Sequence, residues 1–242
     1  MSPVFDYVES NPSIGILFGV RIMPDTHDSE IALSQDMSIA ETAAVTGVST
    51  RKINRLIDDG LMPESAFKRV GKSRFVKAFA APMVRFGAGD GVMLSKEARI
   101  EVMKTVARYT KSNWRRLVAD PDQALDLRFE SGAVTVALGE NVSSAMTRLG
   151  KLAAAHRRIV VDPNIRGGMP VMRGTRAGVY EVAAARAADG IEAVLEDFPA
   201  LTWEDVEAAE IYAQAHPRMG RPRSARAGRL VAEVQVDLAG IR

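Results

Sequence analysis

The chain has 242 residues, 47% of them hydrophobic, which is enough for packed cores and excludes wholesale disorder. It contains no cysteine, which excludes disulfide bonds and cysteine-ligated metals, and no apolar run approaches the ~18 residues that cross a bilayer. The net charge of +2 combines blocks of opposite sign, which indicate separate surfaces with separate partners.

Residues 1–36 form an acidic N-terminal segment with six acidic residues and one arginine. The apolar stretch at 14–20 follows acidic residues and ends at an arginine, unlike a secretory signal, so we expect a cytoplasmic protein. The three histidines, His27, His156 and His216, are far apart in the sequence. We therefore expect no metal site and no cofactor.

Residues 37–91 are predicted to form a winged helix-turn-helix domain. Ser38 and Glu41 make a capping-box pattern at the start of a first helix, and Gly47 marks a tight turn before a second helix. Two short strands in the basic segment FKRVGKSRFV would form the wing. The stretch that follows, 79–91, is poorly patterned and is predicted to be a connector.

The second helix and the wing are strongly basic, since residues 51–85 hold nine lysines and arginines against three acidic residues. Such side chains would neutralise DNA phosphates, and a recognition helix in the major groove would read base edges. The candidate DNA-binding residues are Thr50, Arg51, Lys52, Asn54, Arg55, Lys68, Arg69, Lys72 and Arg74. The alternative is a three-helix core with a solvated basic face.

The stretch AAVTGVSTRKINRLIDDGLM, with its GVS turn and its glycine after the second helix, resembles the winged DNA-binding domain of the MerR family. The resemblance covers roughly residues 38 to 77. It implies a DNA-binding role for the second helix and the wing.

Residues 92–156 are predicted to be a helical connector with a central β-hairpin. One helix is expected from Ser95 to about Tyr109, and another over 146–156. Between them, LDLRFESGAVTVALGE alternates apolar and polar residues around a Glu-Ser-Gly turn, so each strand would have one buried face, with Leu125 on it. We expect a structural or dimer-contact role for this hairpin.

The stretch VVDPNIRGGMPVMRGTR, residues 160–176, combines three glycines with three arginines and raises the question of a phosphate site. Its spacing fits neither a P-loop nor a dinucleotide-binding fingerprint, so we interpret it as a shaped connection. Adjacent glycines allow positive φ, and a proline fixes the exit of the loop. The structural loop residues are Gly168, Pro170, Arg173, Gly174, Thr175 and Arg176.

Three helical stretches follow this loop: one over 179–188, a short one ending near Phe198, and one that begins with a capping box at Thr202 and Asp205. The order of motifs, D-P, then G-x-P-x-x-R-G-T-R, then D-F-P-x-L-T, resembles the domain of unknown function 433 over about residues 158–215. This resemblance implies a small strand followed by a trihelical, helix-turn-helix-like unit. Such units are often dimeric and are common in antitoxins of the VapB type.

The unit at 157–215 is acidic where it is helical, since residues 182–215 hold eight acidic residues against one arginine. DNA phosphates would repel such helices. We therefore interpret the unit as a dimerisation and protein-contact module, whose loop arginines pair with acidic helices of the same unit or of a second copy.

Residues 216–242 form a basic tail with six arginines and two acidic residues. Apolar and polar residues alternate over 230–238, as in a strand added to the sheet edge of a partner. The VapB resemblance implies that this segment wraps a toxin, usually a PIN-domain ribonuclease, where arginines would compete with Mg²⁺ for the toxin's carboxylates. The candidate toxin-binding residues are Arg221, Arg223, Arg226, Arg229, Leu230, Val234 and Val236. The alternatives are a solvated tail or one that adds nonspecific DNA affinity.

As a whole, the sequence predicts a mainly α protein with small β elements: an N-terminal winged helix-turn-helix, a central β-hairpin and a C-terminal trihelical helix-turn-helix-like domain. We expect a non-enzymatic antitoxin, a homodimer or higher assembly without membrane contact, that binds operator DNA to repress its own operon and neutralises a toxin. One alternative is a stand-alone transcriptional regulator without a toxin. The other is an enzyme, for which the sequence offers no convergent set of titratable groups.

Overall fold

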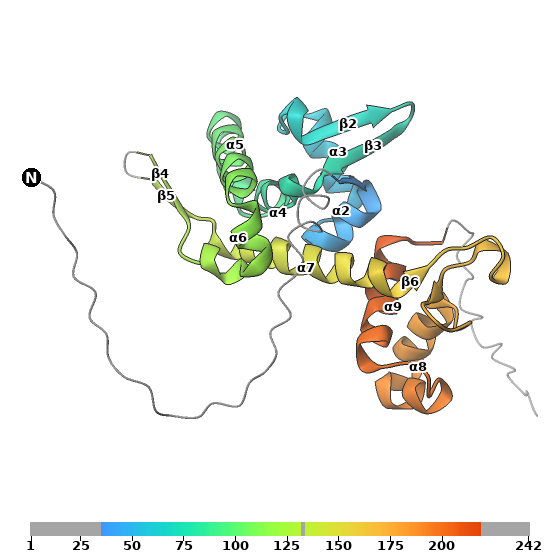
Figure 1. Cartoon of the computed structure of the whole chain (residues 1–242). Helices are drawn as coiled ribbons and strands as arrows, with labels where there is room; N and C mark the ends of the chain where they lie inside the picture. The colour runs from blue at the N-terminus through green and yellow to red at the C-terminus, as the bar shows by residue number, and fades with distance from the viewer. Residues whose placement is uncertain (1–34, 132–133, 219–242) are drawn as a thin grey trace, which may run out of the picture.

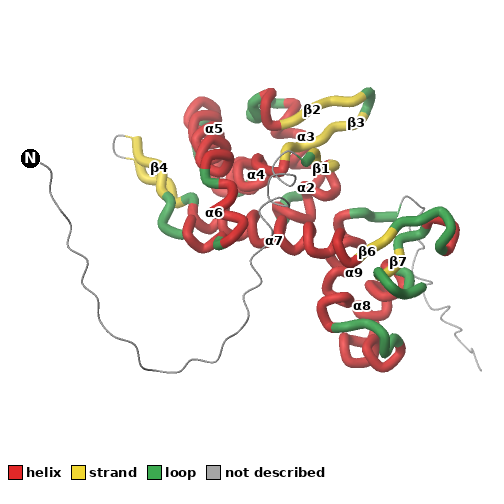
Figure 2. Tube along the Cα trace, in the orientation of Figure 1, coloured by secondary structure: helices red, strands yellow, loops and turns green. Residues whose placement is uncertain are grey.

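The computed structural model describes residues 35–131 and 134–218 as a mainly α protein with small antiparallel sheets of two or three strands, as predicted (Figure 1). Figure 2 shows the strands gathered in separate small sheets among the helices. Within the two described ranges, no helix is both long and apolar enough to cross a membrane. The acidic segment 1–34 lies outside the described residues. So do the candidate toxin-binding residues Arg221, Arg223, Arg226, Arg229, Leu230, Val234 and Val236.

The N-terminal part is a pair of short helices followed by a β-hairpin, with a three-stranded antiparallel sheet of order β1-β3-β2. Its elements are β1 (Asp36–Ser38), α2 (Ile39–Thr46), α3 (Thr50–Asp58), β2 (Phe67–Val70) and β3 (Ser73–Lys77). The predicted capping box forms, because the Ser38 hydroxyl accepts from the Glu41 N–H while the Glu41 carboxylate accepts from the Ser38 N–H. Gly47 ends α2 at φ 68°, in the left-handed region that favours glycine, and the Ser49 hydroxyl caps α3.

The stretch after this hairpin is a deeply buried helix, and the prediction of a connector over 79–91 is wrong. In α4 (Ala81–Ala88), seven of the eight residues are buried, and the side chain of Phe86 is completely enclosed. A helix surrounded by protein on all sides has no polar face, so it lacks the amphipathic period by which a sequence reveals a helix. Helix α4 packs against α5 (Lys96–Ser112), the helix predicted to start near Ser95.

The central hairpin is shorter than predicted and projects from the helical body (Figure 1). The elements of this region are α6 (Trp114–Ala119), β4 (Arg128–Ser131) and β5 (Val134–Ala137). Leu125 was expected on the buried face, but it precedes β4 in a turn and is 51% exposed. The buried anchor is Leu138, whose N–H donates to the Leu127 carbonyl (2.8 Å) where the hairpin meets the body.

The longest described helix, α7 (Gly139–Arg158), begins well before the predicted start at 146. The sequence does not indicate a helix in these first turns, because polar residues are buried there and the amphipathic pattern is absent. The Asn141 amide donates to Asp90 (2.9 Å), and the Ser143 hydroxyl donates to Asp122 (2.8 Å). These bonds satisfy the polar groups, so a helix that looks hydrophilic at its start still packs into the core.

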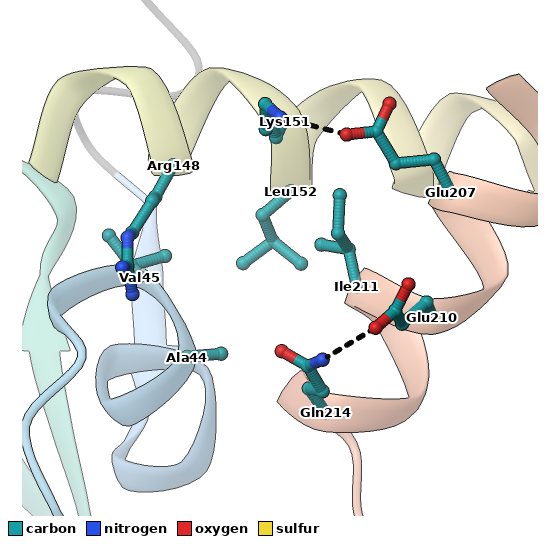
Figure 3. A pocket seen from close by; sticks show the side chains of 9 residues that line it. All are labelled: Ala44, Val45, Arg148, Lys151, Leu152, Glu207, Glu210, Ile211 and Gln214. Atoms are coloured by element: carbon teal, nitrogen blue, oxygen red, sulfur yellow. Dashed lines mark hydrogen bonds and ion pairs between the residues drawn. The ribbon is translucent and has the colours of Figure 1, made fainter. Parts of the chain in front are cut away.

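The C-terminal part has its own hydrophobic core and packs against both α7 and α2. Its elements are β6 (Ile159–Val160), β7 (Val171–Met172), α8 (Val179–Asp197) and α9 (Trp203–Ala215). Helix α8 is broken at Gly190, which has φ 87°, so the three predicted helical stretches are present. Figure 3 shows α7 beside α9, where Lys151 pairs with Glu207 (2.8 Å) and Leu152 lies near Ile211.

The packed chain continues past residue 216, where the tail was predicted to begin. The Tyr180 hydroxyl donates to the His216 carbonyl (2.7 Å), and the Arg218 guanidinium lies over the Tyr180 ring at 4.3 Å. His216 and Arg218 therefore both contact Tyr180 of α8.

Replacing Phe86 with Ala should lower the free energy of unfolding by about 3–5 kcal/mol, because it removes a fully buried ring and leaves a cavity. Leu125→Ala is the matched control. Its side chain is half exposed, and its loss should cost about 0.5 kcal/mol or less. Urea denaturation followed by circular dichroism measures both, and equal effects would contradict the burial of α4.

Candidate nucleic-acid interface

One face of α3 carries candidate DNA-binding side chains because the opposite face is anchored in the core. The buried face consists of Ile53, Leu56 and Ile57. The exposed side chains opposite are Thr50, Arg51, Lys52 and Arg55. The first three lie in the first turn of the helix, where the backbone N–H groups and the helix dipole also favour anions.

The β2–β3 hairpin is fastened to α3 by one arginine. The Arg74 guanidinium donates to the Asn54 Oδ1 (3.1 Å) and pairs with the Asp58 carboxylate (2.7 Å). The hydrogen bond from Arg74 holds the pKa of Asp58 below its usual range. Asn54 and Arg74, both predicted to contact DNA, are thus bound to each other and position the hairpin against the helix.

Acidic neighbours engage two further candidates. Lys68 in β2 pairs with Asp36 in β1, which Lys77 also contacts at 2.6 Å. Arg55 pairs with Asp59 one turn later (3.3 Å). The net positive charge of this segment does not show that these acids pair with the basic residues. The four-residue spacing of Arg55 and Asp59 does indicate an ion pair on a helix.

Four of the candidate DNA-binding residues are basic, exposed and without an ion pair to any residue that the structure describes. They are Arg51, Lys52, Arg69 and Lys72. Lys72 stands at the hairpin turn and lines, together with Asn54 and Arg74, a groove of about 570 Å³ between α3 and β3. Asp58 also lines this groove and is paired with Arg74, so Lys72 supplies the positive charge that has no ion-pair partner there among the described residues.

The glycine-rich loop before α8 adopts the backbone expected of it. Its three glycines have positive φ: Gly167 at 67°, Gly168 at 82° and Gly174 at 76°. Arg166 pairs with Glu181 of α8 through contacts of 2.5 and 2.7 Å, which is the predicted pairing of a loop arginine with an acidic helix. The Pro170 carbonyl accepts from the Val179 N–H (3.0 Å) and closes the loop onto the helix.

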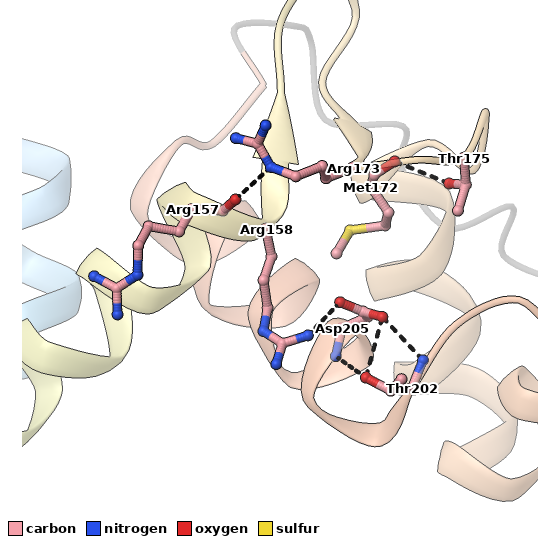
Figure 4. Close-up of polar contacts among 7 residues, drawn as sticks. All are labelled: Arg157, Arg158, Met172, Arg173, Thr175, Thr202 and Asp205. Atoms are coloured by element: carbon pink, nitrogen blue, oxygen red, sulfur yellow. Dashed lines mark hydrogen bonds and ion pairs between the residues drawn. The ribbon is translucent and has the colours of Figure 1, made fainter. Parts of the chain in front are cut away.

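Other loop side chains bind backbone groups (Figure 4). The Arg173 Nε donates to the Arg157 carbonyl (2.6 Å), and the Thr175 hydroxyl donates to the Met172 carbonyl (3.0 Å). Arg173 therefore departs from the expected pairing with an acidic helix, because a carbonyl at the end of α7 takes its hydrogen bond. Arg176 is exposed and makes no ion pair with the described part of the chain.

An ion pair connects the end of α7 to the start of α9 (Figure 4). Arg158 contacts one oxygen of Asp205 at 2.7 Å, while the other oxygen accepts from the Thr202 N–H at 3.0 Å and completes the predicted capping box. Burial raises the pKa of Asp205, but hydrogen bonds from Thr202 and Arg158 outweigh burial and leave this pKa below its usual value. Asp205 thus completes the capping box of α9 and also links α9 to the end of α7 by an ion pair.

Comparison with known proteins bears on the C-terminal part and on the chain as a whole. Residues 159–213 match the family described as protein of unknown function (DUF433), which confirms the resemblance predicted over 158–215. The uncharacterized protein y4eO of Sinorhizobium fredii is 35% identical to this chain over 197 residues, which cover 79% of this chain and 86% of the relative. No solved structure matches the chain.

Replacing Asp205 with Ala should lower the free energy of unfolding at pH 7 by about 1–2 kcal/mol, because the Thr202 N–H loses its acceptor in the capping box and Arg158 loses its partner. The pKa of Asp205 is lowered in the folded state, so the carboxylate stabilises the fold above its ordinary pKa of 3.8. That contribution is lost as the pH falls through the lowered folded-state pKa.

Urea denaturation of both proteins at neutral pH and at pH values below 3.8 measures this dependence. The two proteins should converge at low pH, and a difference that stays constant would contradict the role of the carboxylate. Glu196→Ala is the control, since this acid of α8 is exposed and its loss should change stability by about 0.5 kcal/mol or less.

Proposed function

The chain belongs to the family of the Sinorhizobium fredii protein y4eO and has a DUF433 region at 159–213, and on this premise we propose that it is a DNA-binding antitoxin. In this proposal it acts in the cytoplasm without enzymatic activity, binds the operator of its own operon as a homodimer or higher assembly, and neutralises a partner toxin. One observation carries the DNA-binding part: exposed basic side chains lie together on α3 and on the hairpin that is fastened to it.

The distribution of charge along α3 supports a defined orientation on DNA. Thr50, Arg51 and Lys52 occupy the first turn, whereas Asp58 and Asp59 lie at the other end. A helix that enters the major groove with its N-terminal turn brings the basic residues to base edges and phosphates. The same orientation keeps the two carboxylates away from the phosphates.

In the proposal, the β2–β3 hairpin is the wing that contacts the sugar-phosphate backbone. Arg69 and Lys72 are exposed on it and supply phosphate contacts. Arg74 and Asn54 act as positioning residues, because their hydrogen bond and the ion pair of Arg74 with Asp58 hold the wing at a set distance from α3. Helix and wing then meet the duplex as one unit.

The antitoxin half of the proposal is supported by the charge of the C-terminal part and by its DUF433 region. Residues 182–215 carry eight acidic residues against one arginine, so DNA phosphates would repel them. We therefore propose that these helices contact proteins. The basic segment beyond Arg218 is proposed to contact the toxin, a PIN-like ribonuclease whose metal-binding carboxylates attract arginine.

Replacing Arg51 and Lys72 together with Ala should weaken binding to the DNA upstream of the protein's gene. A lost base contact should cost about 1–3 kcal/mol, and each lost phosphate contact should reduce the dependence of log K on log salt by about one unit. Fluorescence anisotropy titrations at several salt concentrations measure both effects.

The matched control is the double variant Arg173→Ala and Arg176→Ala, which removes the same charge from the loop of the C-terminal part. It should bind DNA like the wild type. Equal losses in the two double variants, or no loss in either, would contradict the assignment of α3 and the hairpin.

A chain that ends after Arg218 should keep its DNA affinity and lose its ability to neutralise the toxin, because the proposed toxin-binding residues all follow this position. Pull-down and growth rescue with the product of the adjacent gene measure the loss. A shortened chain that still silences the toxin would place the contact on α8 or α9. A full-length chain that binds DNA but has no toxin partner would be a stand-alone regulator.

A further inference from the structure

Two histidines meet one glutamate at the junction of α2, α7 and α9. Glu41 lies in the first turn of α2, His156 in the last turn of α7, and His216 directly follows α9. The Glu41 Oε1 lies 3.2 Å from the His216 Nε2 and 3.9 Å from the His156 Nε2. The expectation that sequence separation keeps the histidines apart is therefore wrong for this pair, whereas His27 lies outside the described residues.

The facing atoms of Glu41 and His216 are aimed by contacts behind them. The Glu41 Oε2 accepts from the Ser38 N–H at 2.7 Å, so Oε1 is the oxygen turned toward the histidines. The His216 Nδ1 lies 3.2 Å from the Tyr212 carbonyl, and when the neutral imidazole donates there, its lone pair is on Nε2. Metal-binding histidines are held in this way, by a hydrogen bond from the ring nitrogen that does not bind the metal.

Aromatic packing restrains the two imidazoles. The Tyr212 ring stacks on the His216 ring at 4.1 Å between centroids and meets the His156 ring edge-on at 5.7 Å. The Tyr180 hydroxyl donates a hydrogen bond to the His216 carbonyl. The Glu41 side chain is 12% exposed and the imidazoles are 31% and 30% exposed, so the cluster is enclosed on the carboxylate side and reachable from the imidazole side.

The protons of the cluster are unevenly shared. The hydrogen bond that the His216 Nε2–H donates to the Glu41 carboxylate raises the pKa of His216, whereas burial lowers the pKa of His156 and favours its neutral form. Neutral imidazole is the form that binds a metal, and a divalent cation bound here displaces the proton that lies between His216 and Glu41.

We propose that Glu41, His156 and His216 bind one divalent transition-metal ion, with Zn²⁺ as the best match. Two imidazoles and one carboxylate, with a fourth position open, are a ligand set that zinc accepts, whereas Mg²⁺ and Ca²⁺ prefer oxygen ligands alone. Tetrahedral bonds of about 2.0–2.2 Å place ligand atoms roughly 3.4 Å apart. The three atoms here lie within 4.8 Å of one another, so small side-chain rotations close the site.

The ion joins three segments that are distant in the sequence. Glu41 lies in α2, which leads directly into α3. His156 and His216 lie at the C-terminal ends of α7 and α9. Because the ligands come together only in the folded chain, the ion stabilises the docking of the C-terminal part against α2.

The experiment uses the full-length protein, freed of metal by a chelator and titrated with zinc chloride in a calorimeter. We expect one equivalent of zinc per chain and a rise in Tm that a chelator reverses. His156→Ala and His216→Ala should each weaken zinc binding at least about tenfold. His27→Ala is the matched control, since it removes the third histidine of the chain and should leave zinc binding unchanged.

Because His216→Ala also removes packing at the end of α9, Glu41→Gln serves as a second variant. Its amide oxygen still accepts from the Ser38 N–H, so α2 keeps its cap, but it offers the metal no charge. This variant should keep the wild-type circular dichroism spectrum and lose the rise in Tm with zinc.

Three results would overturn the proposal. One is no zinc uptake by the wild type at micromolar concentrations. Another is undiminished zinc binding in the folded His156→Ala and Glu41→Gln variants. The third is loss of zinc binding in His27→Ala.

Discussion

The burial of α7 against helices from both parts of the chain is the interaction on which the architecture depends. Val142, Met146 and Leu149 enter the first hydrophobic core, and Ala155 enters the second. Burying an aliphatic side chain of this size contributes about 1.5–3 kcal/mol, so a helix with buried residues along its whole length fixes its neighbours firmly. Since α2 and α9 both pack on α7, the N-terminal and C-terminal parts are held side by side, and residues from both ends meet around Glu41.

Charge is divided over this frame in a way that separates two kinds of surface. Basic side chains without ion-pair partners in the described chain lie on α3 and the hairpin, while acids in the same region fasten the hairpin, as Asp58 does for Arg74 and Asp36 for Lys68. The C-terminal helices are acidic, and two arginines outside them pair with their acids, Arg158 with Asp205 and Arg166 with Glu181. The proposed functions follow this division, with DNA at the basic surface and protein partners at the acidic one.

Features with a local cause could be predicted from the sequence, and features that depend on tertiary contacts could not. The capping boxes that begin α2 and α9 join residues three positions apart, so their pattern is visible in the chain. Helix α4 has no polar face, and the start of α7 buries Asn141 through a bond to a distant aspartate, so neither shows the expected period. His156 and His216 lie close together because α2, α7 and α9 pack against one another. The spacing of the histidines in the sequence does not indicate this packing.

Cross-linking is the most direct test of the DNA-binding account, and the chain suits it because it contains no cysteine. A single cysteine is introduced as Lys72→Cys at the hairpin turn or as Arg176→Cys in the exposed loop of the C-terminal part. Each variant is mixed with duplex DNA from upstream of the gene. The backbone of this DNA carries thiol tethers activated as mixed disulfides, so that the cysteine forms a protein–DNA disulfide by exchange and releases the activating thiol. The yield of this disulfide is measured. The account predicts efficient cross-linking through Lys72→Cys and little through Arg176→Cys. The reverse result would contradict it and would place the DNA on the C-terminal part.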